Sequence, residues 1–206
     1  WRVMPSIEHL TGPISGRTDD PIGALTCLLR DAMPTWWETV LGVAGGAIGE
    51  ASAAALILAG LFLAWRGLLR PGAVVLGVIV AAVAAAVLPV QVRSESGESV
   101  LLWLPGMAVW QGLPVGLMYI LYHLTAGEFL LVMLLLAPET TTSPRTSGGH
   151  MVYLALVGFA TMFLRIVVGI PAAGYWALLI ANTLVPAISA MTRRRSREQA
   201  AREERR

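Results

Sequence analysis

The sequence predicts an all-α polytopic membrane protein with about five transmembrane helices, some of them broken or re-entrant. Hydrophobic residues make up 56% of the 206 positions and charged residues only 14%, whereas soluble domains are about 25% charged. Several apolar runs approach or exceed the roughly 18–20 residues that cross a bilayer. The charges gather between these runs and in the C-terminal tail, so the runs themselves are suited to lipid.

The apolar runs predict the spans in order along the chain. The first is closed by "RGLLRPG", the second ends at Pro89, and the last two are joined by the short turn "GIPAAG". Pro105, Pro114 and Gly127 interrupt the third run, which is long enough for more than one segment. The runs lie at roughly 40–65, 72–90, 100–138, 151–169 and 172–191.

Arginine bias predicts the orientation, because cytoplasmic loops collect arginine. Arginines follow both the first run (Arg66, Arg70) and the last run (Arg193–Arg195), so both places should be cytoplasmic. Both conditions hold if 100–138 crosses once, with a re-entrant or interfacial piece at 101–112. Five crossings then place the N-terminal loop on the outer side and the C-terminus in the cytoplasm.

These features divide the chain into three regions. Residues 1–39 are expected to form an outward-facing loop with a short helix, 40–191 the transmembrane domain, and 192–206 a charged cytoplasmic tail. This tail is solvated, binds anionic lipid or continues the last helix. Asp20 followed by Pro21 predicts a helix start, for a helix over roughly 21–32. The chain begins at Trp1 with no signal-peptide pattern, and we expect its natural start to lie further upstream.

Four ionisable residues lie in or near the apolar runs: Glu50, His123, Glu128 and Arg165. Such groups are costly in lipid and should face protein, a cavity or a cofactor. Glu50 and Glu128 each follow a glycine at the entry to an apolar run, which suits either an ion pathway at broken helices or a structural hydrogen bond. Arg165 either snorkels to the interface or holds an anionic group. His123 is expected to be a packed or interfacial histidine.

Several chemistries are excluded by the residues. Cys27 is the only cysteine, so no internal disulfide and no cysteine-based metal centre can form, and no metal site is predicted. The sequence has no G-x-G-x-x-G after a strand, no P-loop and no H-E-x-x-H. The arginines lie where membrane topology needs them, so nucleic acid is not an expected partner.

The order of five motifs resembles one known family. "ISGRT", "GGAIGEASAAALILAGLFLAWRG", "HLTAGEF", "APETTTSP" and "IPAAGYWALLIANTLVPAI" are similar, over about residues 11–192, to the C-terminal half of the RnfD/NqrB family. This family comprises the D subunit of Rnf complexes and the B subunit of the sodium-translocating NADH:quinone reductase. Its members have ten spans in two five-span repeats, and this chain resembles the second repeat.

The resemblance implies a covalent FMN. In the family, its phosphate is esterified to a threonine that ends an S-G-A-T type motif in an outward-facing loop. The matching residues here are Ser15, Gly16, Arg17 and Thr18, so Thr18 is the expected attachment residue, and Arg165 is expected to assist the flavin. The opposing interpretation is that Thr18 only belongs to the turn before the helix that starts at Pro21. Riboflavin, known in the Nqr branch, is a second expected cofactor without an assigned position.

The implied function is that of a membrane subunit in a flavin-dependent, redox-driven Na⁺ or H⁺ translocating complex of the bacterial inner membrane. It would work with flavoprotein and iron–sulfur subunits and would catalyse nothing alone. Departures from the family pattern, at Arg17, Pro138, Glu139, Ala172 and Ser189, leave two alternatives open. One is an accessory subunit that has lost the flavin, and the other is a transporter without redox chemistry.

Overall fold

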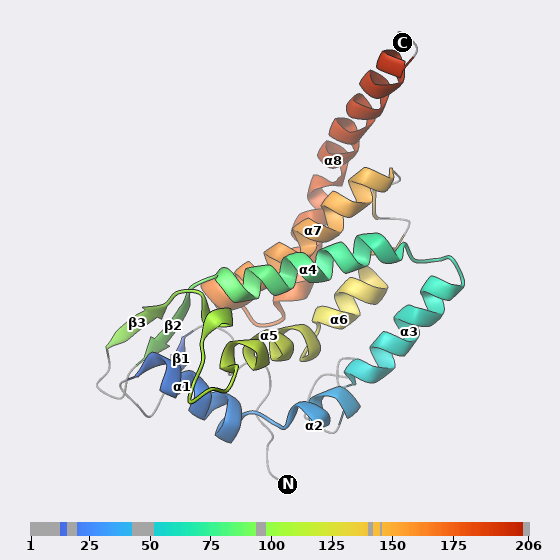
Figure 1. Cartoon of the computed structure of the whole chain (residues 1–206). Helices are drawn as coiled ribbons and strands as arrows, with labels where there is room; N and C mark the ends of the chain where they lie inside the picture. The colour runs from blue at the N-terminus through green and yellow to red at the C-terminus, as the bar shows by residue number, and fades with distance from the viewer. Residues whose placement is uncertain are drawn as a thin grey trace.

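The computed structural model describes residues 13–15, 20–42, 52–93, 98–139, 142–144 and 146–203, and Figure 1 shows a mainly helical molecule. Short elements come first, followed by the long apolar helices. The elements are β1 (Ile14–Ser15), α1 (Pro21–Cys27), η2 (Leu28–Ala32), α2 (Trp36–Leu41), α3 (Ala53–Trp65), α4 (Pro71–Val87), β2 (Val90–Arg93), β3 (Ser99–Leu102), η3 (Pro105–Met107), α5 (Val115–Thr125), α6 (Phe129–Leu131), η4 (Val132–Leu136), α7 (Ser147–Phe163), η5 (Leu164–Val168) and α8 (Ala173–Glu203).

Two helical segments are long and apolar enough to cross a membrane, namely Ser147–Val168 (α7 with η5) and Ala173–Thr192 of α8. A third is a bent pair, α5 with α6 and η4, which meet at 57°. The remaining two apolar helices, α3 and α4, are shorter. The predicted class of helical membrane protein is confirmed, and the five crossings stay a prediction that these five apolar segments suit.

The apolar helices run between two ends of the molecule. The sheet end holds β1, β2, β3 and α1, together with the turn between η5 and α8 (Figure 1). The opposite end holds the loop between α3 and α4 and the N-terminus of α7, where Thr146 and Thr192 hydrogen-bond through their hydroxyls. Both arginine-flanked helix ends, after α3 and within α8, lie at the opposite end (Figure 1). The side of the membrane that each end faces stays a prediction.

The predicted helix at 21–32 is confirmed as α1 continued by η2. The Asp20 carboxylate accepts hydrogen bonds from the backbone N–H groups of Ile22 and Gly23, and Pro21 takes the first helical position. This arrangement satisfies N–H groups that have no partner within the helix, and it fixes where α1 begins.

A three-stranded sheet at the sheet end was not predicted. β1 pairs in parallel with β2 and β2 antiparallel with β3, in the order β1-β2-β3. Ile14, Val90 and Val92 are buried, and Gln91 and Arg93 are exposed, which is the period of two expected for a strand with one buried face. β2, the strand that alternates, is only four residues long, so its pattern was too short to stand out beside the apolar runs.

Two predicted segments differ in detail. The re-entrant or interfacial piece expected at 101–112 contains no α-helix: it is the end of β3, the 3₁₀ turn η3 and a tight turn in which Trp110 bridges to Leu113. The packing of η3 against α4 and α5 explains why this segment caps the helices. At the C-terminus α8 continues without a break to Glu203, so the charged tail extends the last helix.

The core of the helical part is the close packing of α4 on α7, the most extensive contact between two helices. Small residues allow it. A Cβ on Gly158 would lie 2.3 Å from the carbonyl oxygen of Gly77, and one on Gly77 would lie 2.8 Å from that of Leu154. Small residues at a membrane helix interface let the backbones approach closely and gain van der Waals contact.

Candidate functional site

The bend in the span formed by α5 and α6 places a carboxylate inside the protein. α5 ends at Thr125, and Gly127 adopts a left-handed backbone conformation with φ of 73°, which glycine adopts without the cost that a Cβ brings. Glu128 follows immediately and is 3% exposed. The predicted broken helix before Glu128 is therefore confirmed, and the break directs this side chain into the bundle.

Arg165 reaches the same place from another segment. It lies in the π-helical turn η5 that ends α7, and it is 1% exposed. Its Nη2 donates to Glu128 Oε1 at 2.6 Å, and its Nη1 donates to the backbone carbonyl oxygen of His123 at 2.8 Å. The snorkelling alternative for Arg165 is therefore wrong, and the anionic group that it holds is Glu128.

Glu128 also binds the start of the last helix. The backbone N–H of Gly174, in the first turn of α8, donates to Oε1 at 3.0 Å. This N–H is one of those that a helix N-terminus leaves without an internal partner, and a carboxylate is stabilised there. A Cβ on Gly174 would lie 2.9 Å from Glu128 Cγ, so glycine is needed for the contact.

The pair is best described as a buried ionic clamp, defined by Glu128, Arg165, the His123 carbonyl and the Gly174 N–H. It joins the break in the bent span, the end of α7 and the start of α8. This buried pair is neutral overall, and Oε1, Nη1 and Nη2 are hydrogen-bonded, which reduces its cost in a membrane. The structural hydrogen bond considered for Glu128 is confirmed, and a role for Glu128 in an ion pathway stays a prediction.

The predicted flavin attachment site is described only at its edges. Gly16, Arg17 and Thr18 lie outside the described residues, as does Glu50. Ser15 ends β1, where its backbone faces Arg93 of β2, and Asp20 begins α1. The motif therefore runs from a sheet strand to a capped helix, both at the sheet end, where η5 and Arg165 also lie.

Sequence reasoning missed two contributors to these sites, Gly174 and Arg93. Gly174 carried no signal, because a glycine in a small-residue helix start is common. Arg93 was counted only as a loop charge. The pairing of Arg93 with Ser15 depends on the register of the small sheet, which the sequence did not reveal.

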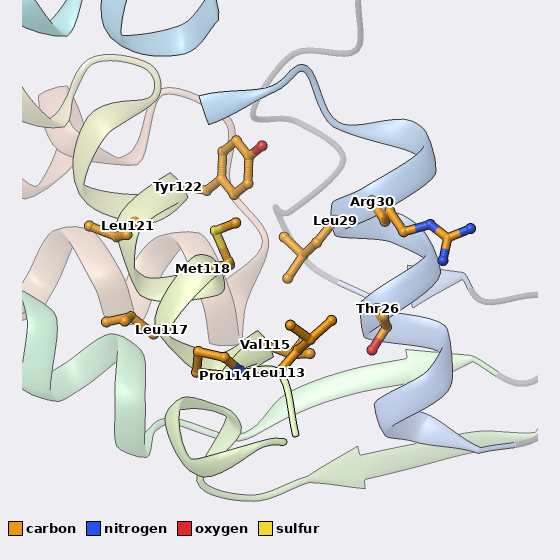
Figure 2. A pocket seen from close by; sticks show the side chains of 10 residues that line it. All are labelled: Thr26, Leu29, Arg30, Leu113, Pro114, Val115, Leu117, Met118, Leu121 and Tyr122. Carbon is orange, nitrogen blue, oxygen red and sulfur yellow. The ribbon is translucent and has the colours of Figure 1, made fainter. Parts of the chain in front are cut away.

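A cavity of about 370 Å³ lies between η2 and α5, and Figure 2 shows Leu29 and Met118 pointing toward one another across it. Its polar side chains are already engaged: Thr26 donates to the Ile22 carbonyl, Tyr122 to the Pro34 carbonyl, and Arg30 pairs with Asp31. The cavity therefore offers an apolar surface and no reactive group. The lining residues are Thr26, Leu29, Arg30, Leu113, Pro114, Val115, Leu117, Met118, Leu121 and Tyr122.

Fold and site together define a class: a helical membrane protein whose broken spans meet at a buried ion pair, with a small sheet capping one end. A model of the NQR2, RnfD, RnfE family matches residues 8–198. The chain therefore belongs to this family, and the resemblance drawn from its motifs is confirmed.

Curated relatives agree with this assignment. The chain is 25% identical, over 93% of its length, to the D subunit of the Na(+)-translocating ferredoxin:NAD(+) oxidoreductase complex of Acetobacterium woodii. It is 27% identical over 75% of its length to the B subunit of the Na(+)-translocating NADH-quinone reductase of Chromohalobacter salexigens. It is 28% identical over 87% to the D subunit of the ion-translocating oxidoreductase complex of Stutzerimonas stutzeri. The matched regions are 52%, 34% and 45% of these relatives, so the chain spans about half their length or less.

Proposed function

We propose that this chain is the flavin-bearing membrane part of a redox-driven, ion-translocating oxidoreductase complex, with FMN esterified through its phosphate to Thr18. The observation that carries the proposal is the family match over residues 8–198, which includes the whole run from Ser15 to Thr18. The relatives are subunits of complexes named for translocating ions and for oxidoreductase activity.

The described edges of the motif suit a tethered cofactor. Only four residues separate Ser15, held in the sheet, from the Asp20 cap of α1. Thr18 is therefore only three residues from Ser15 in β1 and two from the Asp20 cap. Arg93, exposed and opposite Ser15, supplies a positive charge at the end of β1, and a guanidinium stabilises the single negative charge of a phosphodiester.

The flavin would supply one-electron or two-electron transfer, and the protein would hold and orient it. Flavoprotein and iron–sulfur subunits would deliver the electrons, and their passage would be coupled to transport of Na⁺ or H⁺ across the bacterial inner membrane. Glu50 and Glu128 are the proposed ion-pathway residues. For Glu128, participation requires the ionic clamp to open, since its Oε1 is bonded to both Arg165 and Gly174.

A second candidate function is an accessory subunit without flavin. The occupied guanidinium of Arg165 favours it, because Arg165 was expected to assist the flavin and instead binds Glu128 and the His123 carbonyl. The two functions differ in one property that can be measured directly, the mass of the peptide that contains Thr18.

The test uses the chain purified from its native membrane complex. A covalent flavin makes the band fluoresce under ultraviolet light after denaturing electrophoresis, and the Thr18 peptide should carry the added mass of FMN less one water. Thr18→Ala should abolish both signals, while Thr11→Ala, in the same N-terminal segment, should leave them. An unmodified Thr18 peptide in the assembled complex would favour the accessory subunit.

A further inference from the structure

Two side chains with polar groups lie one turn apart on α5, completely inside the protein. Tyr119 and His123 are both 0% exposed, and their rings meet edge to face with centroids 4.4 Å apart. The carbonyl of His123 receives the hydrogen bond from Arg165. The two rings therefore lie beside the ionic clamp, inside the bent span.

The polar atoms of both rings have no hydrogen-bond partner among the described residues. These atoms are the Tyr119 hydroxyl and both nitrogens of His123, and only one other buried side-chain atom in the described part of the chain, Thr39 Oγ1, shares this property. Buried polar atoms in folded proteins are nearly always bonded to protein or to ordered water, because a buried atom without a partner has lost its hydrogen bonds to water and gained none in return.

Other buried polar side chains of the long helices follow that rule. Tyr153, also 0% exposed, donates to the side-chain oxygen of Asn182 at 2.6 Å, and Thr161 donates to the Val157 carbonyl. The lack of hydrogen-bond partners is therefore confined, among these helices, to one place on α5. The three atoms without a partner indicate a ligand that Tyr119 and His123 share.

The chemistry of the three atoms selects the ligand. A neutral imidazole presents one donor and one acceptor, and a phenol presents both, so the ligand must donate and accept. A metal cation does not fit, because the Arg165 guanidinium is adjacent and the described residues contain no group of three His, Cys, Asp or Glu side chains that could hold one. Water fits, since an internal water typically makes about three hydrogen bonds to buried polar groups.

We propose that Tyr119 and His123 form an internal water-binding site beside the ionic clamp, at the break of the bent span. The site gives a proton a hydrogen-bonded position beside Arg165, the residue that joins His123 to Glu128 in the ionic clamp. It is independent of flavin attachment, because none of its residues belongs to the Thr18 segment.

Hydroxyl-radical footprinting by X-ray radiolysis tests the site in the full chain, within its native complex in lipid nanodiscs. Radicals form from bound water as well as from bulk water, so a buried residue that touches internal water is modified. Tyr119 should be oxidised several-fold faster than Tyr153, which is likewise 0% exposed but whose hydroxyl has a protein partner. Equal protection of the two tyrosines would overturn the proposal.

A variant provides the second measurement. Tyr119→Phe removes the hydroxyl and should lower the melting temperature by about 2–4 °C, the shift expected for loss of one net hydrogen bond in a domain of this size. An unchanged or higher melting temperature would show that the hydroxyl had no partner. A lower melting temperature together with a protected Tyr119 would show that the hydroxyl is bonded to a protein group. Either of these two outcomes would reject the water site.

Discussion

Glu128 is a carboxylate that the protein buries between three helical segments, with Arg165 as its counter-charge. The Nη2 to Oε1 distance of 2.6 Å is slightly shorter than the roughly 2.7–2.9 Å usual for a charge-assisted N–H···O bond. The two oppositely charged groups come from positions 37 residues apart in the sequence. Each was recognisable in the sequence as a costly group in a membrane, but the partnership was not, because it depends on how the bent span meets the end of α7.

At the residue scale, Glu128→Gln should strongly destabilise the protein. The substitution leaves the Arg165 charge buried without a counter-charge, and breaking a buried pair in this way costs about 3–5 kcal/mol. The melting temperature in nanodiscs measures the effect. The matched control is Asp31→Asn, which removes the exposed pair with Arg30 and should change stability little, because exposed pairs contribute little.

Replacing both partners distinguishes the effect of the buried charge on stability from the effect of lost packing. Glu128→Leu combined with Arg165→Met should recover much of the stability lost in Glu128→Gln, since apolar residues of similar volume can substitute for a buried pair. If Glu128→Gln were as harmless as Asp31→Asn, the ionic clamp would not stabilise the junction of the three segments.

At the element scale, the contact of α4 with α7 depends on glycines that the sequence showed only as composition. Two glycines of α7 differ sharply in surroundings: a Cβ on Gly158 would meet the Gly77 carbonyl oxygen at 2.3 Å, whereas nothing lies within 4 Å of a Cβ on Gly148. The difference arises because only Gly158 lies where the two backbones touch.

This difference predicts opposite effects for one substitution. Gly158→Ala should force the two helices apart and lower the melting temperature, with a cost of about 1–3 kcal/mol for overpacking. Gly148→Ala should be neutral or stabilise by up to about 1 kcal/mol, because alanine favours the helix more than glycine. Thermal unfolding of both variants measures this, and similar melting temperatures would contradict the close packing.

The elements also explain which features could be predicted. The Asp20–Pro21 start of α1 and the glycine break before Glu128 are local, since each is set by residues next to it in the chain. The small sheet is not local. β1 contributes only Ile14 and Ser15, and these pair with Val92 and Arg93, a register that no pattern within two residues can specify.

At the scale of the whole molecule, α4 runs from the opposite end to the sheet end (Figure 1). Its 17 residues span roughly 26 Å at 1.5 Å per residue, which is close to the thickness of the hydrocarbon core. Glu98 lies exposed just before β3, and Arg66 lies exposed just after α3. If α4 crosses the membrane, these two positions lie on opposite sides of it.

The single native cysteine makes this topology directly measurable. In a Cys27→Ser background, Glu98→Cys should react with a membrane-impermeant maleimide from the periplasmic side, and Arg66→Cys should react only from the cytoplasmic side. Labelling of intact spheroplasts and of inverted vesicles measures the two cases. Labelling of both cysteines from one side would contradict the five-crossing arrangement.

The sequence by itself determined the class of this protein, the approximate helical segments, the start of α1 and the break at Gly127. These depend on hydrophobicity and on neighbouring residues, which act over a few positions of the chain. Only the tertiary structure decided that Glu128 binds Arg165 and Gly174, that Ser15 lies opposite Arg93, and that Tyr119 and His123 share one buried place. Those contacts join segments distant in the sequence, and their geometry is set by how the broken helices pack together.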